Sequence, residues 1–157
     1  MVRTIVLAVL ALCASAPALA QDKPDAKDSK AIQDCIKSKP TKPESCVGQI
    51  SDPCLGDEKK VLSTIEMAAC HAREQAVWDD ILNNTYRRLN DKLDDEQRVK
   101  LREMQRAWIA YRDTTCGFHW IYYRGTIANP LGAGCLNEET ARRALFLLGF
   151  LDNAEGK

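Results

Sequence analysis

The fold is decided by residues 78–111, which read WDDILNNTYRRLNDKLDDEQRVKLREMQRAWIAY. Apolar side chains recur there at mainly three- and four-residue steps, with charged and amide side chains between them. This spacing is typical of amphipathic α-helices. We predict one long helix from about residue 57 to residue 93 and a second over about residues 95–116. Their apolar positions are Ile65, Ala69, Ala72, Ala76, Trp78, Leu82, Tyr86, Leu89 and Leu93, then Leu101, Met104, Trp108 and Tyr111.

The junction between these helices is Asp94-Asp95-Glu96-Gln97, which supplies side-chain acceptors and negative charge suited to a helix start. Because so few residues connect them, the helices either pack antiparallel as a hairpin or merge into one rod. The hairpin protects both apolar stripes from water better, and we favour it.

The chain beyond Cys116 is rich in glycine and aromatic residues, and we predict a loop over residues 117–135. Asn137, followed by two glutamates, predicts the N-cap of a last helix. Its apolar residues cover so much of the circumference that we expect it to pack, largely buried, across the hairpin. They are Ala141, Ala144, Leu145, Leu147, Leu148 and Leu151. The predicted fold class is all-α: a small antiparallel helical hairpin or bundle with a C-terminal helix.

The N-terminal region is expected to be an export signal and a leader. Residues 1–20 combine Arg3, a short apolar run and a small-x-small ending at Ala20, which is typical of a signal peptide. Cys13 follows a leucine, where a lipoprotein signal has a small residue, so we expect no lipid anchor. Residues 21–50 are predicted to be a flexible leader, because residues 21–34 are almost free of apolar side chains. A short helix is expected over residues 31–38, and the helical domain itself over residues 51–153.

Composition limits the partners and the compartment. The mature chain has a formal charge close to zero, which gives no long-range attraction to nucleic acid or anionic lipid. The apolar run of the signal is too short to span a bilayer, and no later segment is longer, so we expect no membrane insertion of the mature chain. We expect a secreted protein of a bacterial periplasm.

Six cysteines remain once Cys13 is removed, and an even number in a secreted chain predicts a disulfide framework. Six cysteines allow about 15 pairings. Proximity along the chain favours three bridges, whereas a link between Cys70 and Cys116 would contradict this scheme. The favoured pairs are Cys35 with Cys46, Cys54 with Cys70, and Cys116 with Cys135.

Motifs of hydrolytic, zinc-dependent or phosphate chemistry (G-x-S-x-G, H-E-x-x-H, a phosphate-binding glycine loop) do not occur in the sequence. Carboxylates such as Glu74 lie on predicted amphipathic helices, and we interpret them as part of a solvated face. Histidine occurs only at His71 and His119, and the chain has no C-x-x-C pair, so we expect no metal site. His71 is interpreted as a surface or bridge-packing residue. We therefore expect neither an enzyme nor a cofactor.

The segment 105–116 reads QRAWIAYRDTTC and carries the most specific pattern. Trp108 and Tyr111 share one helix face, and Arg112 lies one turn beyond Trp108, where its stem can cover the indole. We expect the Arg112 guanidinium to reach a carboxylate on the neighbouring helix. Because adjacent residues on a helix do not face each other, we expect Arg112 and Asp113 to have separate partners.

Three motifs in this order resemble the domain of lysozyme inhibitor LprI-like proteins, over about residues 54–150. They are Asp79-x-x-Leu82-Asn83-x-x-Tyr86, then Gln105-Arg106-Ala107-Trp108-Ile109-x-Tyr111-Arg112-Asp113-x-x-Cys116, then Cys135 with Thr140-x-x-Arg143. The resemblance implies a secreted, disulfide-linked, all-helical domain and, as protein partner, a lysozyme whose cleft it blocks. The motif residues are expected to be mainly structural. This chain differs in lacking a lipobox and in adding the leader with Cys35 and Cys46.

The segment that we expect to bind lysozyme is the aromatic one after Cys116. Large, stiff aromatic side chains are typical of binding surfaces, and cationic donors suit the two carboxylates of a glycosidase. The same aromatic residues could instead plug the end of the bundle, and the acidic turn over residues 91–96 offers a basic lysozyme another contact. The alternative function is a periplasmic protein-binding or envelope-assembly module without inhibitory activity. The candidate binding residues are His119, Trp120, Tyr122, Tyr123 and Arg124.

Overall fold

The computed structural model describes residues 23–57 and 59–156; the predicted signal peptide, with Arg3 and Cys13, lies outside this range. Every regular element in the described ranges is a helix, which confirms the all-α fold class. None of these helices is long and apolar enough to cross a membrane. The elements are α1 (Ala26–Lys37), the 3₁₀ helix η1 (Pro43–Cys46), α2 (Ser51–Leu55), α3 (Thr64–Lys92), α4 (Asp95–Tyr123) and α5 (Ala128–Glu155).

The starts of α3 and α4 are fixed by capping boxes. Ser63 accepts a hydrogen bond from the backbone N–H of Glu66, whose carboxylate accepts from the Ser63 N–H in return. Asp94 and Gln97 form the same reciprocal pair at the start of α4. Each box satisfies two N–H groups that a helix end leaves unpaired. The predicted start of α4 is confirmed, whereas α3 begins at its cap, later than the predicted residue 57.

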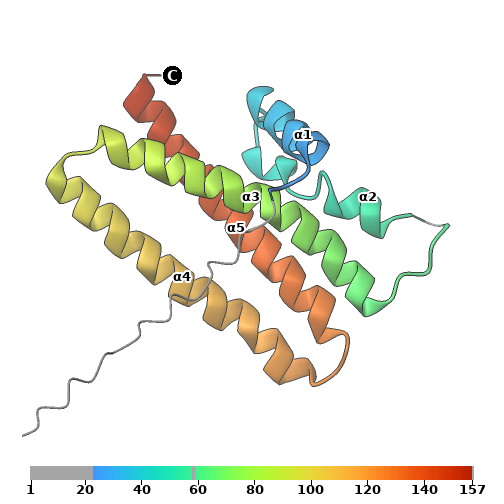
Figure 1. Cartoon of the computed structure of the whole chain (residues 1–157). Coiled ribbons are helices and arrows are strands. Elements are labelled where there is room, and N and C mark those ends of the chain that lie inside the picture. Colours follow the sequence, from blue (N-terminus) through green and yellow to red (C-terminus); the bar gives the residue numbers. More distant parts are fainter. Residues whose placement is uncertain (1–22, 58, 157) are drawn as a thin grey trace, which may run out of the picture.

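The core lies between α3 and α5, which cross at the centre of the molecule (Figure 1). Val77, Trp78 and Leu82 of α3 are buried there. The α5 side of the core consists of Ala141, Ala144, Leu147 and Leu151. The chain turns sharply between α3 and α4 as expected, but these two helices then diverge (Figure 1). The expected packing of α3 on α4 is therefore wrong, because α5 presents a more continuous apolar surface and takes the place beside α3.

The loop predicted over residues 117–135 is also wrong. Helix α4 continues to Tyr123, α5 begins at Ala128, and Asn137 lies buried within α5 instead of capping it. Pro130 is in the first turn of α5, where its missing N–H is not needed. Gly132 provides close contact instead of a turn, since a Cβ there would lie 2.1 Å from the Trp120 ring. Glycine in this segment thus serves packing between helices.

All three disulfides favoured by proximity are confirmed. Cys35–Cys46 joins α1 to η1, Cys54–Cys70 joins α2 to α3, and Cys116–Cys135 joins α4 to α5. Their Cα atoms are 5.7, 5.8 and 5.4 Å apart, within the range usual for disulfides. Each bridge therefore joins two helices that follow one another along the chain.

The segment predicted to be a flexible leader contains α1, which is capped by the Asp25 side chain and begins at Ala26, before the expected residue 31. Helix α1 docks through Ile32, whose exposed fraction is 0%, with Cys35 and Ile36 partly buried against the core beside it. Asp28 of α1 also accepts a hydrogen bond of 2.7 Å from Nη2 of Arg73 on α3. Helices α1 and α2 lie on the side of α3 away from α4 (Figure 1).

Glu74 of α3 is fully buried, contrary to the expected solvated face. Its carboxylate accepts from the backbone N–H groups of Gly48, Ile50 and Ser51 at 2.7, 2.9 and 2.8 Å, and from Trp78 Nε1 at 3.0 Å. Burial alone would raise the pKa of Glu74, but these donors together hold the pKa below its ordinary value. One carboxylate thus fastens the segment before α2 to α3.

Candidate functional site

The candidate binding residues do not lie in a loop. His119, Trp120, Tyr122 and Tyr123 lie in the last two turns of α4, and Arg124 is the C-cap of that helix. Tyr122 and Tyr123 are 66% and 45% exposed. Phe118, one turn before Tyr122, and Ile121, directly before Tyr122, are also exposed. We call Phe118, Ile121, Tyr122 and Tyr123 the α4-end surface. It is an apolar, solvent-facing patch on a helix whose base is fixed by the Cys116–Cys135 bridge.

The rings near this surface contact one another. Tyr122 meets Tyr123 edge to face with centroids 4.9 Å apart, and Phe118 lies 5.8 Å from Tyr122. His119 stacks on Tyr123 at 5.9 Å with an interplanar angle of 6°. These distances are those of favourable aromatic pairs. The α4-end surface is therefore held in one arrangement before any partner arrives.

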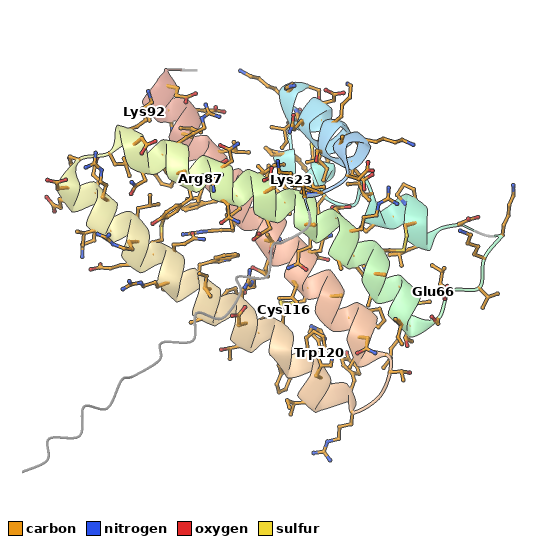
Figure 2. The ribbon with its side chains drawn as sticks, viewed as in Figure 1. Lys23, Glu66, Arg87, Lys92, Cys116 and Trp120 are labelled. Carbon is orange, nitrogen blue, oxygen red and sulfur yellow. A yellow bond between two sulfur atoms is a disulfide. The ribbon has the colours of Figure 1, made fainter. Side chains whose placement is uncertain are left out.

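Trp120 has a different role from its neighbours. Its ring covers Gly132 of α5, and its Nε1 donates to Asn129 Oδ1 at 3.2 Å. Figure 2 shows Trp120 at the junction of α4 and α5, about one turn of α4 beyond Cys116. Trp120 is 40% exposed, so it both packs on α5 and faces solvent, whereas Tyr122 and Tyr123 contact neighbouring rings of α4.

Arg124 ends α4 in the left-handed conformation, with φ of 45°. Such a conformation is uncommon for a residue with a Cβ and is typical of a helix C-cap. Arg124 is exposed, so its guanidinium stands at the tip of the molecule, next to Tyr123. The cap places a cationic donor beside the aromatic patch.

The motif residues form a second cluster, between α3, α4 and α5. The Arg112 guanidinium lies 4.9 Å from the Trp108 ring centroid, and the Arg143 guanidinium lies 5.6 Å from it. Arg143 donates from Nε to Gln105 Oε1 at 2.9 Å, and its burial lowers its pKa. The indole thus packs between two cations, an arrangement that is favourable to each.

The expected position of Arg112 over Trp108 is confirmed, but its expected partner is wrong. Arg112 donates to the Oδ1 of the adjacent Asp113, from Nε at 2.9 Å and from Nη2 at 2.7 Å. The long arginine side chain folds back far enough to reach a neighbour whose Cβ faces elsewhere. Arg112 still acts on α3 through its charge: burial raises the pKa of Asp79, and Arg112 opposes that rise.

A polar groove of about 630 Å³ separates α3 from α4 at this level. Asp79, Asn83 and Arg87 line it from α3, and Arg112 lines it from α4. Asn83 donates to Asp79 Oδ2 at 2.9 Å. Figure 2 shows the labelled Arg87 on α3 and Lys23 near the same helix. Of the remaining motif residues, Leu82 is buried, Tyr86 packs partly buried against the core, and Tyr111 is exposed.

The sequence did not reveal that Phe118 and Ile121 belong to an exposed apolar surface, or that Glu74 and Arg143 are buried charged residues. Phe118, Ile121 and Tyr122 follow each other at three- and one-residue steps, which places them on one side of a helix. That signal was present but was hidden by the loop prediction. For Glu74 and Arg143 the decisive signal is not local, because the backbone donors to Glu74 lie 23 or more residues away and the Gln105 partner of Arg143 lies 38 residues away.

The fold and its bridges define a class: an all-helical, disulfide-linked domain of the kind that occurs outside the cytoplasm. The family model described as "Lysozyme inhibitor LprI" matches residues 54–147, and the chain belongs to this family. The match covers α3 and α4 and most of α5, and so includes the motif cluster and the α4-end surface.

The chain is also similar to a relative from Rhizobium meliloti (strain 1021), the uncharacterized protein R02472. The two are 33% identical over 113 residues, which cover 63% of this chain and 81% of the relative. No solved structure matches the chain. The family and the disulfides together indicate an extracytoplasmic protein with a protein partner.

Proposed function

We propose that this protein is a periplasmic lysozyme inhibitor that binds the enzyme through the α4-end surface and blocks its active cleft. The observation that carries the proposal is the exposed, pre-arranged aromatic patch on a family member whose fold fixes that patch at the end of a bridged helix. Binding, not catalysis, is the activity assigned.

The physical argument rests on rigidity and shape. Aromatic side chains bring large contact area with little rotamer freedom to lose, and they are enriched among residues that dominate binding energy. The tip of α4 is convex, because the helix ends there and the chain turns back over four residues. A narrow protruding tip suits a glycosidase cleft better than a flat face does.

The chemistry of the tip supports the same target. Glycosidases of this kind use two carboxyl groups that flank the scissile bond. The exposed Arg124 guanidinium can form a bidentate pair with a carboxylate. The neighbouring aromatic rings can occupy the place of the sugar in the cleft. The proposed complex therefore has aromatic anchors around one central cation.

The experiment is the clearing of a bacterial cell suspension by lysozyme, followed by turbidity, with and without the purified oxidised protein. Slowed clearing at micromolar protein is the expected result, and lysozymes of several classes should be compared. If none is slowed, inhibition is contradicted. Binding without slowing, measured by calorimetry, would favour the protein-binding or envelope-assembly alternative.

The surface itself is tested by the double variant Tyr123→Ala with Arg124→Ala. We expect inhibition to weaken by roughly tenfold or more, because loss of one central anchor commonly costs 2 kcal/mol or more. Phe150→Ala on α5 is the matched control, since Phe150 is also exposed but distant from α4's end in the sequence and on a different helix. Equal inhibition by the double variant and the control would move the contact elsewhere.

A further inference from the structure

The outward side of α4 carries a regular pattern that extends well before the α4-end surface. Leu101 and Cys116, the buried residues of α4, face the core. Because successive residues of a helix are about 100° apart, the opposite side of α4 consists of residues that repeat at seven-residue steps. We call this set the α4 seam; its members are Ala107, Ala110, Tyr111, Thr114, Gly117, Phe118 and Ile121.

The α4 seam is uncharged and open to solvent. Tyr111, Phe118 and Ile121 are 53%, 61% and 67% exposed. Arg112 and Asp113 are the only Asp, Glu, Lys or Arg between residues 107 and 122, and neither belongs to the seam. The solvent side of a surface helix is normally rich in charged side chains. Apolar residues at a seven-residue step are typical of a helix that packs against another helix.

Gly117 in the middle of the seam has no internal reason to be glycine. A Cβ there would meet nothing within 4 Å, unlike a Cβ at Gly132. Glycine destabilises a helix interior relative to alanine, and it is used where a backbone must be approached closely. A glycine on the outer side of α4 admits a second helix from outside, so the seam favours a helical occupant.

The charges at the edge of the seam select that occupant. Arg106 and Asp113 have opposite charges and lie on the same edge, seven residues apart. Arg106 is exposed and forms no ion pair among the described residues, and Arg112 occupies only Oδ1 of Asp113. An antiparallel second copy of α4 places opposite charges together at both positions, whereas a parallel copy pairs like with like. The edge is thus complementary to itself, as the interface of a two-fold dimer must be.

The position and the area of the seam fit such a dimer. Helix α4 lies at the margin of the molecule, with α1 and α2 beyond α3, so a second copy can approach along it (Figure 1). The large side chains on and beside the seam expose together roughly 1,000 Å² in two copies, which is the size of weak, reversible complexes. They are Tyr111, Phe118, Ile121 and Tyr122.

We infer that the protein forms a weak homodimer in which the α4 seams of two copies pack antiparallel and Arg106 of each copy faces Asp113 of the other. The pairing is centred near Ala110, which lies beside Ala107 of the second copy. Phe118 and Ile121 belong to both the α4 seam and the α4-end surface, so the dimer and a lysozyme complex exclude each other. That consequence rests on the proposed function, whereas the dimer itself does not.

The test is sedimentation equilibrium of the purified, oxidised mature chain from low micromolar to submillimolar concentration. We expect a reversible equilibrium between monomer and dimer. Ala110→Glu should weaken the dimer by about tenfold or more, because it places two carboxylates in the seam. Ala154→Glu, at an exposed alanine near the end of α5, is the matched control and should associate as the native chain does.

A charge swap tests the antiparallel arrangement. Arg106→Asp alone and Asp113→Arg alone should each weaken the dimer several-fold, because each puts like charges together in both pairs. The double variant should recover the association, since both pairs attract again. Asp113→Arg also removes the partner of Arg112, but the double variant shares that loss, so the recovery reports the contact between copies.

Three results would overturn the inference: a chain that stays monomeric at submillimolar concentration, equal association of Ala110→Glu and Ala154→Glu, or a double variant as weak as the single charge variants. No lysozyme is present in this experiment. The dimer and the inhibitory function can therefore each fail without the other.

Discussion

Helices α3 and α4 have the same length, 29 residues, but they use their surfaces differently. Seven residues of α3 are buried, whereas only Leu101 and Cys116 of α4 are. Large apolar side chains of α4 are exposed from Val99 to Tyr123. Exposed apolar side chains gathered on one helix are typical of a contact surface, and this supports the proposed binding through the end of α4. In this protein α3 contributes most of its apolar side chains to the core, whereas α4 leaves most of its large apolar side chains exposed to solvent.

The first prediction tests the role of α3 in the core by removing the buried Glu74 carboxylate. Glu74→Ala leaves three backbone N–H groups and the Trp78 indole without an acceptor, so we expect a loss of about 3–5 kcal/mol in the free energy of unfolding. Denaturant titration measures it. Asp80→Ala, an exposed carboxylate on the same helix, should change stability by less than about 0.5 kcal/mol. Similar values for both would mean that Glu74 does not fasten the N-terminal segment.

The second prediction concerns the disulfide that links α4 to α5. Removing the Cys116–Cys135 bridge by Cys116→Ala with Cys135→Ala should cost roughly 3 kcal/mol, because its loop spans 19 residues. Hydrogen exchange should rise at the end of α4 and the start of α5, while the centres of α3 and α5 stay protected. The variant without Cys35 and Cys46 is the control, and its exchange should rise in α1 and η1 instead. A uniform rise in both variants would contradict the separate roles.

The third prediction tests the contact that joins α4 to α5. Gly132→Ala places a methyl group 2.1 Å from the Trp120 ring, so we expect a loss of about 1–3 kcal/mol. In a Trp120→Ala background the same change should cost little. Gly149→Ala, also in α5 but in open space, should stabilise by up to about 1 kcal/mol. Thermal unfolding of the four variants gives the comparison, and an equal cost in both backgrounds would exclude the ring contact.

The fourth and smallest effect on stability is expected at the tip of α4. Because Tyr122 and Tyr123 face solvent, changing both to alanine should alter the free energy of unfolding by less than about 1 kcal/mol in total. Denaturant titration at unchanged helical circular dichroism measures it. A loss as large as that from Gly132→Ala would show that the tyrosines belong to the packed core.

The sequence predicted α3 and α4 because the apolar residues before and after the turn at Leu93 recur at three- and four-residue steps. It predicted the disulfides because the paired cysteines are close along the chain. It failed after Cys116, where glycine was interpreted as a breaker although Gly132 and Gly134 admit Trp120 and His71 against the backbone. It also missed the start of α1, which lies in a polar segment although Ile32, Cys35 and Ile36 further along the helix pack on the core. Close approach of a side chain to a glycine leaves no periodic signal, because the partners are distant in sequence.

The candidate site was found in part. The aromatic and cationic residues after Cys116 were selected by composition alone, which identified Tyr122, Tyr123 and Arg124 but not their helical setting. The partly buried pair formed by Arg143 and Gln105 spans 38 residues, and the Glu74 contacts span up to 26. Interactions at such separations depend on how α3, α4 and α5 are arranged, and only the fold reveals them.

The bridge between Cys116 and Cys135 has a consequence for proteolysis. The connection from α4 to α5 is short and begins at Arg124, an exposed residue at which trypsin-like proteases cut. Cleavage there would leave both pieces joined through sulfur, on either side of the cut. The nicked chain would gain only the mass of one water molecule under oxidising conditions and would separate into two fragments only after reduction. A cut at this exposed connection therefore leaves the two helices linked, although it lies beside the proposed inhibitory surface.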